Sequence, residues 1–560
     1  MIRPFLLLAF AVSATVSQLQ NPVFPEGWAS TDPTEPSPLG SRLGHVVRVI
    51  DDIREIGGTA GMSIGVMYQG KVVLERHLGF ADVENAAVAT SNTRYPLGSL
   101  TKSFVAATVA QLVEDGLLEW EAPITTYLPE LSFDSDPSLS DQLTLVDLLS
   151  HRTGLVRLDS LWLGADGQVN IRKNETIRMC NHLFAIRPHR SGFLYNNWMY
   201  ALAGQIIERV TNSSFGEALA ALVLDKAGLS QTTLMSSDLP PNSTALPYLI
   251  LDHKLPARMA QDLGMMDGSL MSSAGGIRST VHDMLSWGHA LLGPFRNDSV
   301  LSRQLDALLS GHNILNSSRE SDELYGLGLA KVIMPAQFGK LGFNPGLVNV
   351  PVLSAGTRTP LVFYHNGAIS GYNNCFMLIP ELQAVIVILT NSIAQGDVAD
   401  WAAQTLLQAV LNSPSPIDLR PLAQQAADKW TTFYQTMSDE LERDRIPNTE
   451  EPKHPELVGT YRHETGALAL EVFEMADSNI LKFNINGEQS QVHTLTHYHN
   501  ASFIFLPPSD AELIGRGLFH YGTDTWLLHF KRDSGGRMDR IIWNLDGEAP
   551  AGETFVKLED

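Results

Sequence analysis

Hydrophobic and polar positions repeat with two different periods along the first part of the chain. Residues 62–69 and 71–82 form strand-like apolar runs that are separated by Gly70. This pattern predicts a β-hairpin. Residues 44–56 and 99–118 instead carry apolar side chains at helical spacing. Both of these segments are therefore predicted to be helices.

Strand-like runs return more than two hundred residues later. The segments LVFYHNG and NCFMLIPELQAVIVILTNS lie within residues 361–392, with a turn near Pro380 and Glu381, and a helical pattern follows at 398–411. Mixed helical and loop segments lie in between. Because strands stand at both ends of this part and helices between them, we expect an α+β domain whose sheet is assembled from distant segments.

The pattern changes at about residue 455. Short alternating segments such as LVGTYRHE, ILKFNIN and RIIWNL follow one another, with Gly, Asn and Asp between them. This rhythm predicts a small all-β domain, a barrel or a sandwich, at 455–560. We place the α+β domain at 45–412 and a connector at 413–454.

The composition is that of a soluble globular protein. Of the 560 residues, 44% are hydrophobic and 18% are charged, and the formal net charge is −22. The length exceeds one ordinary domain. A charge of this sign gives no attraction to nucleic acid or to an anionic membrane surface, so we expect neither as a partner.

The N-terminus reads MIRPFLLLAFAVSATVSQLQ, in which Arg3 precedes an apolar stretch from Phe5 to Val12 and small residues follow. This order is typical of a secretory signal peptide, which we place at 1–17, followed by an extended lead-in at 18–44. No later apolar run is long enough to span a bilayer. We therefore expect a secreted, extracellular protein that has no membrane contact once the signal is removed.

Six Asn-x-Ser/Thr sequons behind a signal peptide fit a glycosylated secretory protein. They begin at Asn174, Asn212, Asn242, Asn297, Asn316 and Asn500. The chain has two cysteines, Cys180 and Cys375. In an oxidising compartment they either form one disulfide or stay two buried free thiols, and the sequence leaves both alternatives open.

The first candidate for chemistry is the S-x-x-K segment from Ser99 to Lys102, which opens a predicted helix after a turn at Pro96 and Gly98. Residues three apart share a helix face, so the amine can approach the hydroxyl. A serine is a weak nucleophile until a base takes its proton. A lysine serves as that base only if its pKa falls from about 10.4 towards neutrality, and the apolar helix around Lys102 favours its burial.

The second candidate is the segment from Tyr195 to Asn197, which lies before another helical run. A tyrosine hydroxyl can relay a proton between nucleophile and leaving group if cations lower its pKa. An asparagine two residues on can donate a hydrogen bond to a substrate carbonyl.

The third candidate is the segment from His365 to Ala368, at the end of an apolar strand. Gly367 lets a substrate lie close against the strand edge. The backbone N–H of Ala368 can then pair with that of Ser99 as an oxyanion hole.

Together the three segments resemble the signature of the serine β-lactamase and penicillin-binding protein superfamily. The variants Y-x-N and H-x-G resemble its class C β-lactamase branch, which includes D-aminopeptidases, D-Ala carboxypeptidases, carboxylesterases and acyl-transferring relatives. LTLVDLLSHRTGL at 143–155, AGGIRST at 274–280 and YGLG at 325–328 add to the resemblance. It covers about 45–412, and LVGTY at 457–461 resembles the lipocalin-like tail of some peptidases of this group.

The resemblance implies an antiparallel sheet flanked by helices, with an all-helical subdomain, followed by a barrel-like domain. The site roles that it implies are a nucleophile at Ser99, shared base and acid work at Lys102 and Tyr195, substrate orientation at Asn197, and a lining of the strand edge at His365 and Gly367. True β-lactamases have lysine where His365 stands. A histidine is mostly neutral at pH 7, so it holds a substrate carboxylate less firmly.

We therefore expect a secreted serine hydrolase that cleaves a small-molecule ester, an amide or a short peptide through an acyl-enzyme, with no cofactor and no metal. Two alternatives remain. The same site can transfer the acyl group to an alcohol or amine in the synthesis of a small metabolite, or the chain can be an inactive binding protein on this scaffold. The oligomeric state and the role of the second domain stay open.

Other motifs have plainer interpretations. Ser63 lies in a G-x-S-x-G match, but it sits inside a predicted strand and not on the strand–turn–helix elbow that this motif needs. His493, His497 and His499 lack a carboxylate or cysteine at ligand spacing, which favours a polar strand face over zinc. His151 is interpreted as structural.

Overall fold

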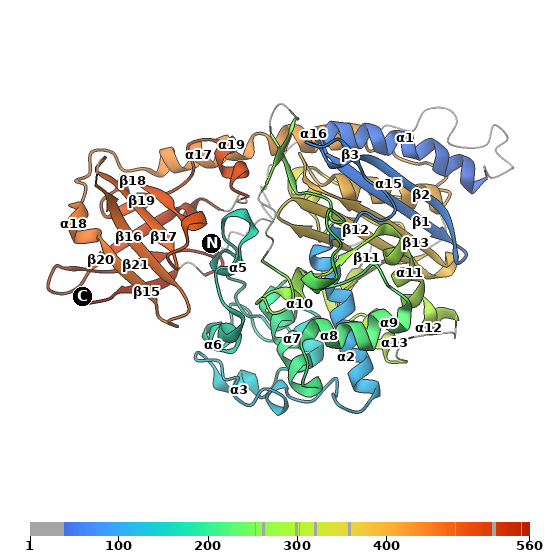
Figure 1. Ribbon diagram of the computed structural model, residues 1–560, viewed down its shortest axis with the longest axis horizontal. Coiled ribbons are helices and arrows are strands. Elements are labelled where there is room, and N and C mark those ends of the chain that lie inside the picture. The colour runs from blue at the N-terminus through green and yellow to red at the C-terminus, as the bar shows by residue number, and fades with distance from the viewer. Residues whose placement is uncertain are drawn as a thin grey trace.

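The computed structural model describes residues 38–559, apart from short gaps at 252–253, 260–263, 297–298, 300, 302, 318–321, 357–359, 477, 518–521 and 550. Figure 1 shows two units, a sheet with helices around it and a β-barrel beside it. The predicted signal peptide at 1–17 and the sequon at Asn297 lie outside the described residues.

The first unit is built on a nine-stranded antiparallel sheet with the order β3-β2-β1-β13-β12-β11-β10-β9-β8. Its strands are β1 (Gly61–Tyr68), β2 (Lys71–Asp82), β3 (Ala87–Val88), β8 (Asn313–Ser317), β9 (Asp322–Tyr325), β10 (Ala330–Ile333), β11 (Leu361–Ile369), β12 (Tyr372–Ile379) and β13 (Ala384–Thr390). The predicted hairpin is β1–β2, and β13 joins it from the far end of the domain. The expected assembly of one sheet from distant segments is thus confirmed.

Helices cover both faces of the sheet (Figure 1). On one face α1 (Leu39–Gly57) and α15 (Val398–Val410) share a core with Ile386 and Ile388 of β13. On the other face α11 (Val281–Leu291) packs with Val387 and its strand neighbours. A strand that is buried on both faces is apolar throughout, and this explains the continuous run AVIVIL in β13.

Most of the remaining helices of the first unit gather below the sheet (Figure 1). The central one is α2 (Thr101–Glu114), whose first twelve residues are all buried. The others are α3 (Pro137–Ser140), α4 (Leu145–Leu149), α5 (Asp159–Trp162), α6 (Thr176–His182), α7 (Asn197–Thr211), α8 (Phe215–Leu219), α9 (Asp225–Ala227), α10 (Ser272–Gly275), α12 (Gly293–Arg296) and α13 (Leu305–Leu309), whereas α14 (Asn344–Leu347) packs against the core on the α1–α15 side of the sheet. This is the expected helical subdomain.

Two small sheets complete the first unit. The ladder β4 (Tyr95–Pro96) with β7 (Arg278–Ser279) leads directly into the S-x-x-K segment. The other sheet joins β14 (Ser392–Ile393), β5 (Tyr248–Ile250) and β6 (Pro256–Arg258).

The second unit is a closed eight-stranded barrel, so the predicted all-β domain is a barrel and not a sandwich. Its strands are β15 (Gly459–His463), β16 (Ala469–Met475), β17 (Ile480–Ile485), β18 (His493–His499), β19 (Ser502–Ile504), β20 (Leu527–Arg532), β21 (Met538–Trp543) and β22 (Glu553–Lys557). Large aromatic side chains such as Phe483, Phe505 and Trp543 pack against one another inside it. Short helices α18 (His454–Leu457) and α19 (Asp510–Gly515) belong to this unit.

The structure differs from the predicted boundaries at two points. Helix α1 begins at Leu39, inside the range assigned to the extended lead-in, because its apolar face already contacts α15. Within the predicted connector, α16 (Arg420–Trp430) packs on α1 and α14, while α17 (Phe433–Asp444) leads to the barrel. The connecting segment is therefore shorter than 413–454.

The two cysteines are free buried thiols, so the disulfide considered from the sequence is absent. Cys180 belongs to the core of the helical subdomain and Cys375 to the core on the α1–α15 side of the sheet. Burial raises the pKa of both thiols, which makes them unreactive. Across the described residues, no helix combines the length and the apolar character needed to cross a membrane.

Candidate active site

Ser99 lies where the short β4 strand turns into helix α2. The chain forms a 3₁₀ turn over Gly98–Leu100, and Gly98 takes a φ of 56°, which favours glycine. The residue before this turn is anchored to another segment, since the Leu97 N–H donates to the Ile277 carbonyl at 2.8 Å. As a result the Ser99 side chain is partly exposed while its neighbours are buried.

Lys102 points back along α2 to the serine. Its Nζ lies 3.1 Å from Ser99 Oγ, 2.9 Å from Asn197 Oδ1 and 3.0 Å from the Ala274 carbonyl oxygen. The side chain has no exposed surface. Burial lowers the pKa of the Lys102 ammonium to about 7, Asp159 opposes this shift and Arg157 adds to it. Near pH 7 a large share of Lys102 is therefore a neutral amine that can accept a proton.

Tyr195 approaches the same hydroxyl from the loop before α7. Its hydroxyl donates to Ser99 Oγ at 2.6 Å. The sequence hypothesis required cations to lower the pKa of this phenol, whereas in the structure burial raises it. Tyr195 thus stays protonated and is suited to donate a proton, whereas Lys102 is suited to accept one.

The loop that carries Tyr195 is fixed by His151, as the structural interpretation of this histidine predicts. The buried imidazole accepts a hydrogen bond from the Asn196 N–H through Nδ1 at 3.1 Å, and its ring lies 4.2 Å from the Tyr195 ring. Burial lowers the pKa of His151 well below its ordinary value, so it stays neutral in this role. His151 has a φ of 56°, which the packing around it maintains.

The strand edge at Gly367 and Ala368 lies against the turn that precedes Ser99. A Cβ added to Gly98 would lie 2.8 Å from the Ala368 backbone N, and one added to Gly367 would lie 2.1 Å from the Leu97 carbonyl oxygen. Both glycines are needed because the two backbones approach too closely for a side chain. The Ala368 amide therefore stands beside the residue that precedes Ser99.

His365 is placed differently from the strand-lining position that the sequence suggested. Its ring is 1% exposed and lies beneath the site, where Nε2 is 3.0 Å from the Tyr325 hydroxyl. Burial, with Lys102 adding to it, lowers the pKa of His365 to about 3. A neutral imidazole bonded to Tyr325 supports the floor of the site.

Sequence reasoning missed the segment Arg157–Asp159, because it carries no motif. Asp159 Oδ1 accepts from Asn197 Nδ2 at 3.0 Å, and Asp159 Oδ2 accepts from Arg157 at 2.8 Å. Because Asn197 also contacts Lys102, Asp159 fixes the orientation of the Asn197 side-chain amide. The Asp159 carboxylate also places a negative charge near the Lys102 amine.

This segment is held by the barrel. Asp546, in the loop after β21, is 5% exposed, and its Oδ2 accepts from the backbone N–H groups of Arg157 at 3.2 Å and Leu158 at 3.3 Å. Leu158 is buried with a φ of 45°, an unfavourable conformation for this residue type. The second unit therefore helps to fix the loop that carries Asp159, which contacts Asn197.

The rival motifs do not form a second site. Ser63 is buried inside β1, where its hydroxyl lies 2.9 Å from both His77 Nδ1 and the Tyr95 hydroxyl. This is a strand and not the elbow of an α/β-hydrolase. On β18, His493 is buried against Phe483, so it belongs to the barrel core and not to the polar strand face that the sequence suggested.

Comparison with known proteins assigns the class. The model of the family described as Beta-lactamase matches residues 46–409, and the chain belongs to this family. A penicillin-binding protein homologue from Pyrococcus abyssi, described as octameric, has a similar fold with a TM-score of 0.53 and 18% identity over 92% of this chain and all of that one. The chain is thus a serine hydrolase of the β-lactamase fold.

Three relatives show its more particular similarities. "Unguisins hydrolase ungD" of Aspergillus violaceofuscus is 24% identical over 89% of this chain and 92% of that protein. "Beta-lactamase" of Escherichia coli is 24% identical over 65% of this chain and 93% of its own length. "Esterase EstB" of Burkholderia gladioli is 29% identical over 39% of this chain and 58% of its own.

The Lys102 amine predicts a definite pH dependence. We expect kcat/KM for an ester to rise with pH through about 7, because only the deprotonated amine accepts the serine proton. Asp159 raises the pKa of Lys102, so Asp159→Asn is expected to move this inflection to lower pH. Initial rates across pH test this, with Asp136→Asn, a change at an exposed helix cap, as the control. An inflection that does not move would contradict the assignment.

A steric prediction concerns Gly367. Gly367→Ala places a methyl group against the Leu97 carbonyl and pushes β11 away from Ser99, which we expect to lower kcat/KM by about 100-fold. Gly346→Ala, where an added Cβ meets nothing within 4 Å, is the matched control. Equal activity of the two variants would show that the strand edge is not part of the site.

A third prediction concerns the barrel contact. Asp546→Ala leaves two N–H groups without their acceptor and releases the strained Leu158, so we expect about a tenfold loss of kcat/KM while the protein stays folded. Glu548→Gln changes the same loop at its contact with Arg187 and serves as the control. Circular dichroism checks that both variants are folded. If their kcat/KM values are then equal, Asp546 does not position the site.

Proposed function

We propose that the chain is a secreted serine hydrolase that cleaves a small ester, amide or short peptide through an acyl-enzyme on Ser99. One observation supports this above all. The Ser99 oxygen is contacted at once by an amine of pKa about 7, at 3.1 Å, and by a protonated phenol, at 2.6 Å. This combination supplies a base and an acid for one nucleophile.

Acylation then follows from the geometry. The neutral Lys102 amine takes the Ser99 proton as the oxygen forms a bond to the substrate carbonyl carbon. The negative charge that develops on the carbonyl oxygen is held by the backbone N–H groups of Ser99 and Ala368. Each such donor contributes about 3–4 kcal/mol of transition-state stabilisation in comparable sites.

Collapse of this intermediate breaks the bond to the leaving group. Tyr195, whose hydroxyl already lies against the serine oxygen, gives its proton to the departing oxygen or nitrogen. The phenolate regains a proton from the Lys102 ammonium, which restores the base. Water then attacks the acyl-enzyme by the same route in reverse, and releases the acid.

Hydrolysis is favoured over the two alternatives. A relative that aligns over 89% of this chain is named a hydrolase, which supports water as the acceptor. An inactive binding protein would not need a buried lysine beside a partly exposed serine, because an ammonium without solvent is costly to bury. Secretion is supported by the N-terminal pattern and by the exposed sequon asparagines Asn174, Asn212, Asn242 and Asn500, whereas Asn316 is half-buried.

The test is covalent labelling. We expect the intact mass of the protein to rise by one acyl group after exposure to one of a panel of p-nitrophenyl esters or to a β-lactam, with the adduct on Ser99 by peptide mapping. The Ser99→Ala variant should form no adduct, and its turnover rate should fall at least 1000-fold. Ser63→Ala, which removes the rival serine, should keep both.

Two results would overturn the proposal. Full turnover by a folded Ser99→Ala variant would place the chemistry elsewhere. Faster transfer to an added alcohol or amine than to water, measured from product ratios, would favour the acyltransferase.

A further inference from the structure

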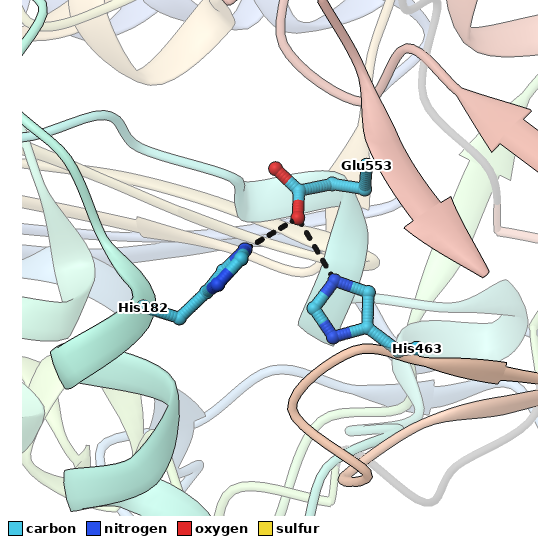
Figure 2. A group of neighbouring side chains, drawn as sticks. All are labelled: His182, His463 and Glu553. Carbon is cyan, nitrogen blue, oxygen red and sulfur yellow. Dashed lines mark hydrogen bonds and ion pairs between the residues drawn. The ribbon is translucent and has the colours of Figure 1, made fainter. Parts of the chain in front are cut away.

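Three side chains that the hydrolase mechanism does not use meet where the two units touch. His182 ends α6 of the first unit, while His463 in β15 and Glu553 in β22 belong to the barrel (Figure 2). Glu553 Oε2 lies 2.7 Å from His182 Nε2 and 2.8 Å from His463 Nε2. No spacing in the sequence shows this group, because His463 is 90 residues and His182 is 371 residues from Glu553.

The three groups converge on one point. Figure 2 shows both imidazoles directing a nitrogen at the same carboxylate oxygen. The ligand atoms all lie within 4.8 Å of one another, and the two rings are nearly perpendicular, at 83°. The side chains of His463 and Glu553 are 0% and 4% exposed, and that of His182 is 14% exposed. The group is therefore largely shielded from water, with a small opening on the side of His182.

The second ring nitrogen of His463 is also held. Its Nδ1 lies 2.7 Å from the Thr465 hydroxyl, which fixes the ring with Nε2 toward Glu553. A histidine that binds a metal commonly has its other nitrogen anchored in this way. The rotamer is therefore set before any ligand arrives.

Further negative charge surrounds the group. Glu464 Oε1 lies 3.6 Å from His182 Nε2, and Asp134 acts on the same imidazole. Two imidazole nitrogens and a carboxylate form a donor set that suits Zn²⁺ and not the oxygen-preferring Mg²⁺ or Ca²⁺. The group itself offers three ligands, and the fourth position would be taken by water.

We propose that His182, His463 and Glu553 bind a Zn²⁺ ion that joins the barrel to the first unit. Donor atoms about 2.0–2.1 Å from a tetrahedral zinc lie about 3.3 Å apart, so the group has to open by about half an ångström from its hydrogen-bonded arrangement. The partial exposure of His182 leaves room for this movement. The ion would be structural, because its ligands do not include Ser99, Lys102 or Tyr195.

The ion would lie close in sequence to the two loops that shape the active site. His182 precedes the loop that carries Tyr195, and Glu553 follows the loop that carries Asp546. A metal bond between the two elements fixes the barrel at the same interface where Asp546 holds Leu158. The inference is independent of the proposed hydrolase chemistry.

The experiment measures zinc in the full-length secreted protein, prepared without a histidine tag. The protein is first dialysed against a chelator, then mixed with equimolar Zn²⁺ and freed of unbound metal by gel filtration. Elemental analysis should then find one zinc ion per chain. The midpoint of thermal unfolding should be higher than that of the metal-free protein by about 3 °C or more. Mg²⁺ should do neither. Co²⁺ in its place should show the visible absorption of a four-coordinate site.

Variants locate the ion. His182→Gln and Glu553→Gln should each abolish stoichiometric retention. His454→Gln is the matched control, because His454 also contacts two carboxylates, Glu474 and Glu451, but without a second imidazole. Retention equal to wild type in folded His182→Gln would overturn the proposal. So would folded wild-type protein that keeps no zinc, which would leave the group as a hydrogen-bonded contact only.

Discussion

The site depends on the cost of keeping the Lys102 amine away from water. A charged ammonium is strongly disfavoured where no solvent reaches it, and α2 buries Lys102 completely. The protein compensates with three oxygens, from Ser99, Asn197 and the Ala274 carbonyl. These come from three separate segments, so the requirement to satisfy one amine brings the start of α2, the start of α7 and helix α10 together around the serine.

Much of this arrangement could be predicted because it is encoded locally. The three-residue spacing of Ser99 and Lys102 needs only a helix, and the alternation along the strands needs only a buried face. The direction of the Tyr195 pKa could not be predicted, because it depends on how many atoms crowd the phenol after folding, and burial prevails there over nearby cations. The position of His365 beneath the site has the same origin, since a strand sequence does not reveal what packs on each face.

Contacts between distant segments were beyond sequence reasoning for a different reason. Asp159 and Asp546 are ordinary acidic residues in unremarkable loops, and only the packing of the barrel against the first unit gives them a role. The same holds for His182, His463 and Glu553, which converge only once β15 and β22 have paired in the barrel. A motif search finds residues that act through neighbours in the sequence, not those that act across an interface.

The barrel is therefore more than an appended domain. A buried leucine with a positive φ stores unfavourable backbone energy, and it persists only where surrounding contacts over-determine it. Asp546 supplies two of those contacts from the second unit, and Asp159, one residue beyond the leucine, bonds the amide that holds the Lys102 amine. A displacement of the barrel would consequently act first on Asp159 and Asn197, and through them on the electrostatic environment of the Lys102 amine. The interface between the units is thus a place where stability of the fold and basicity of the amine are set by the same contacts.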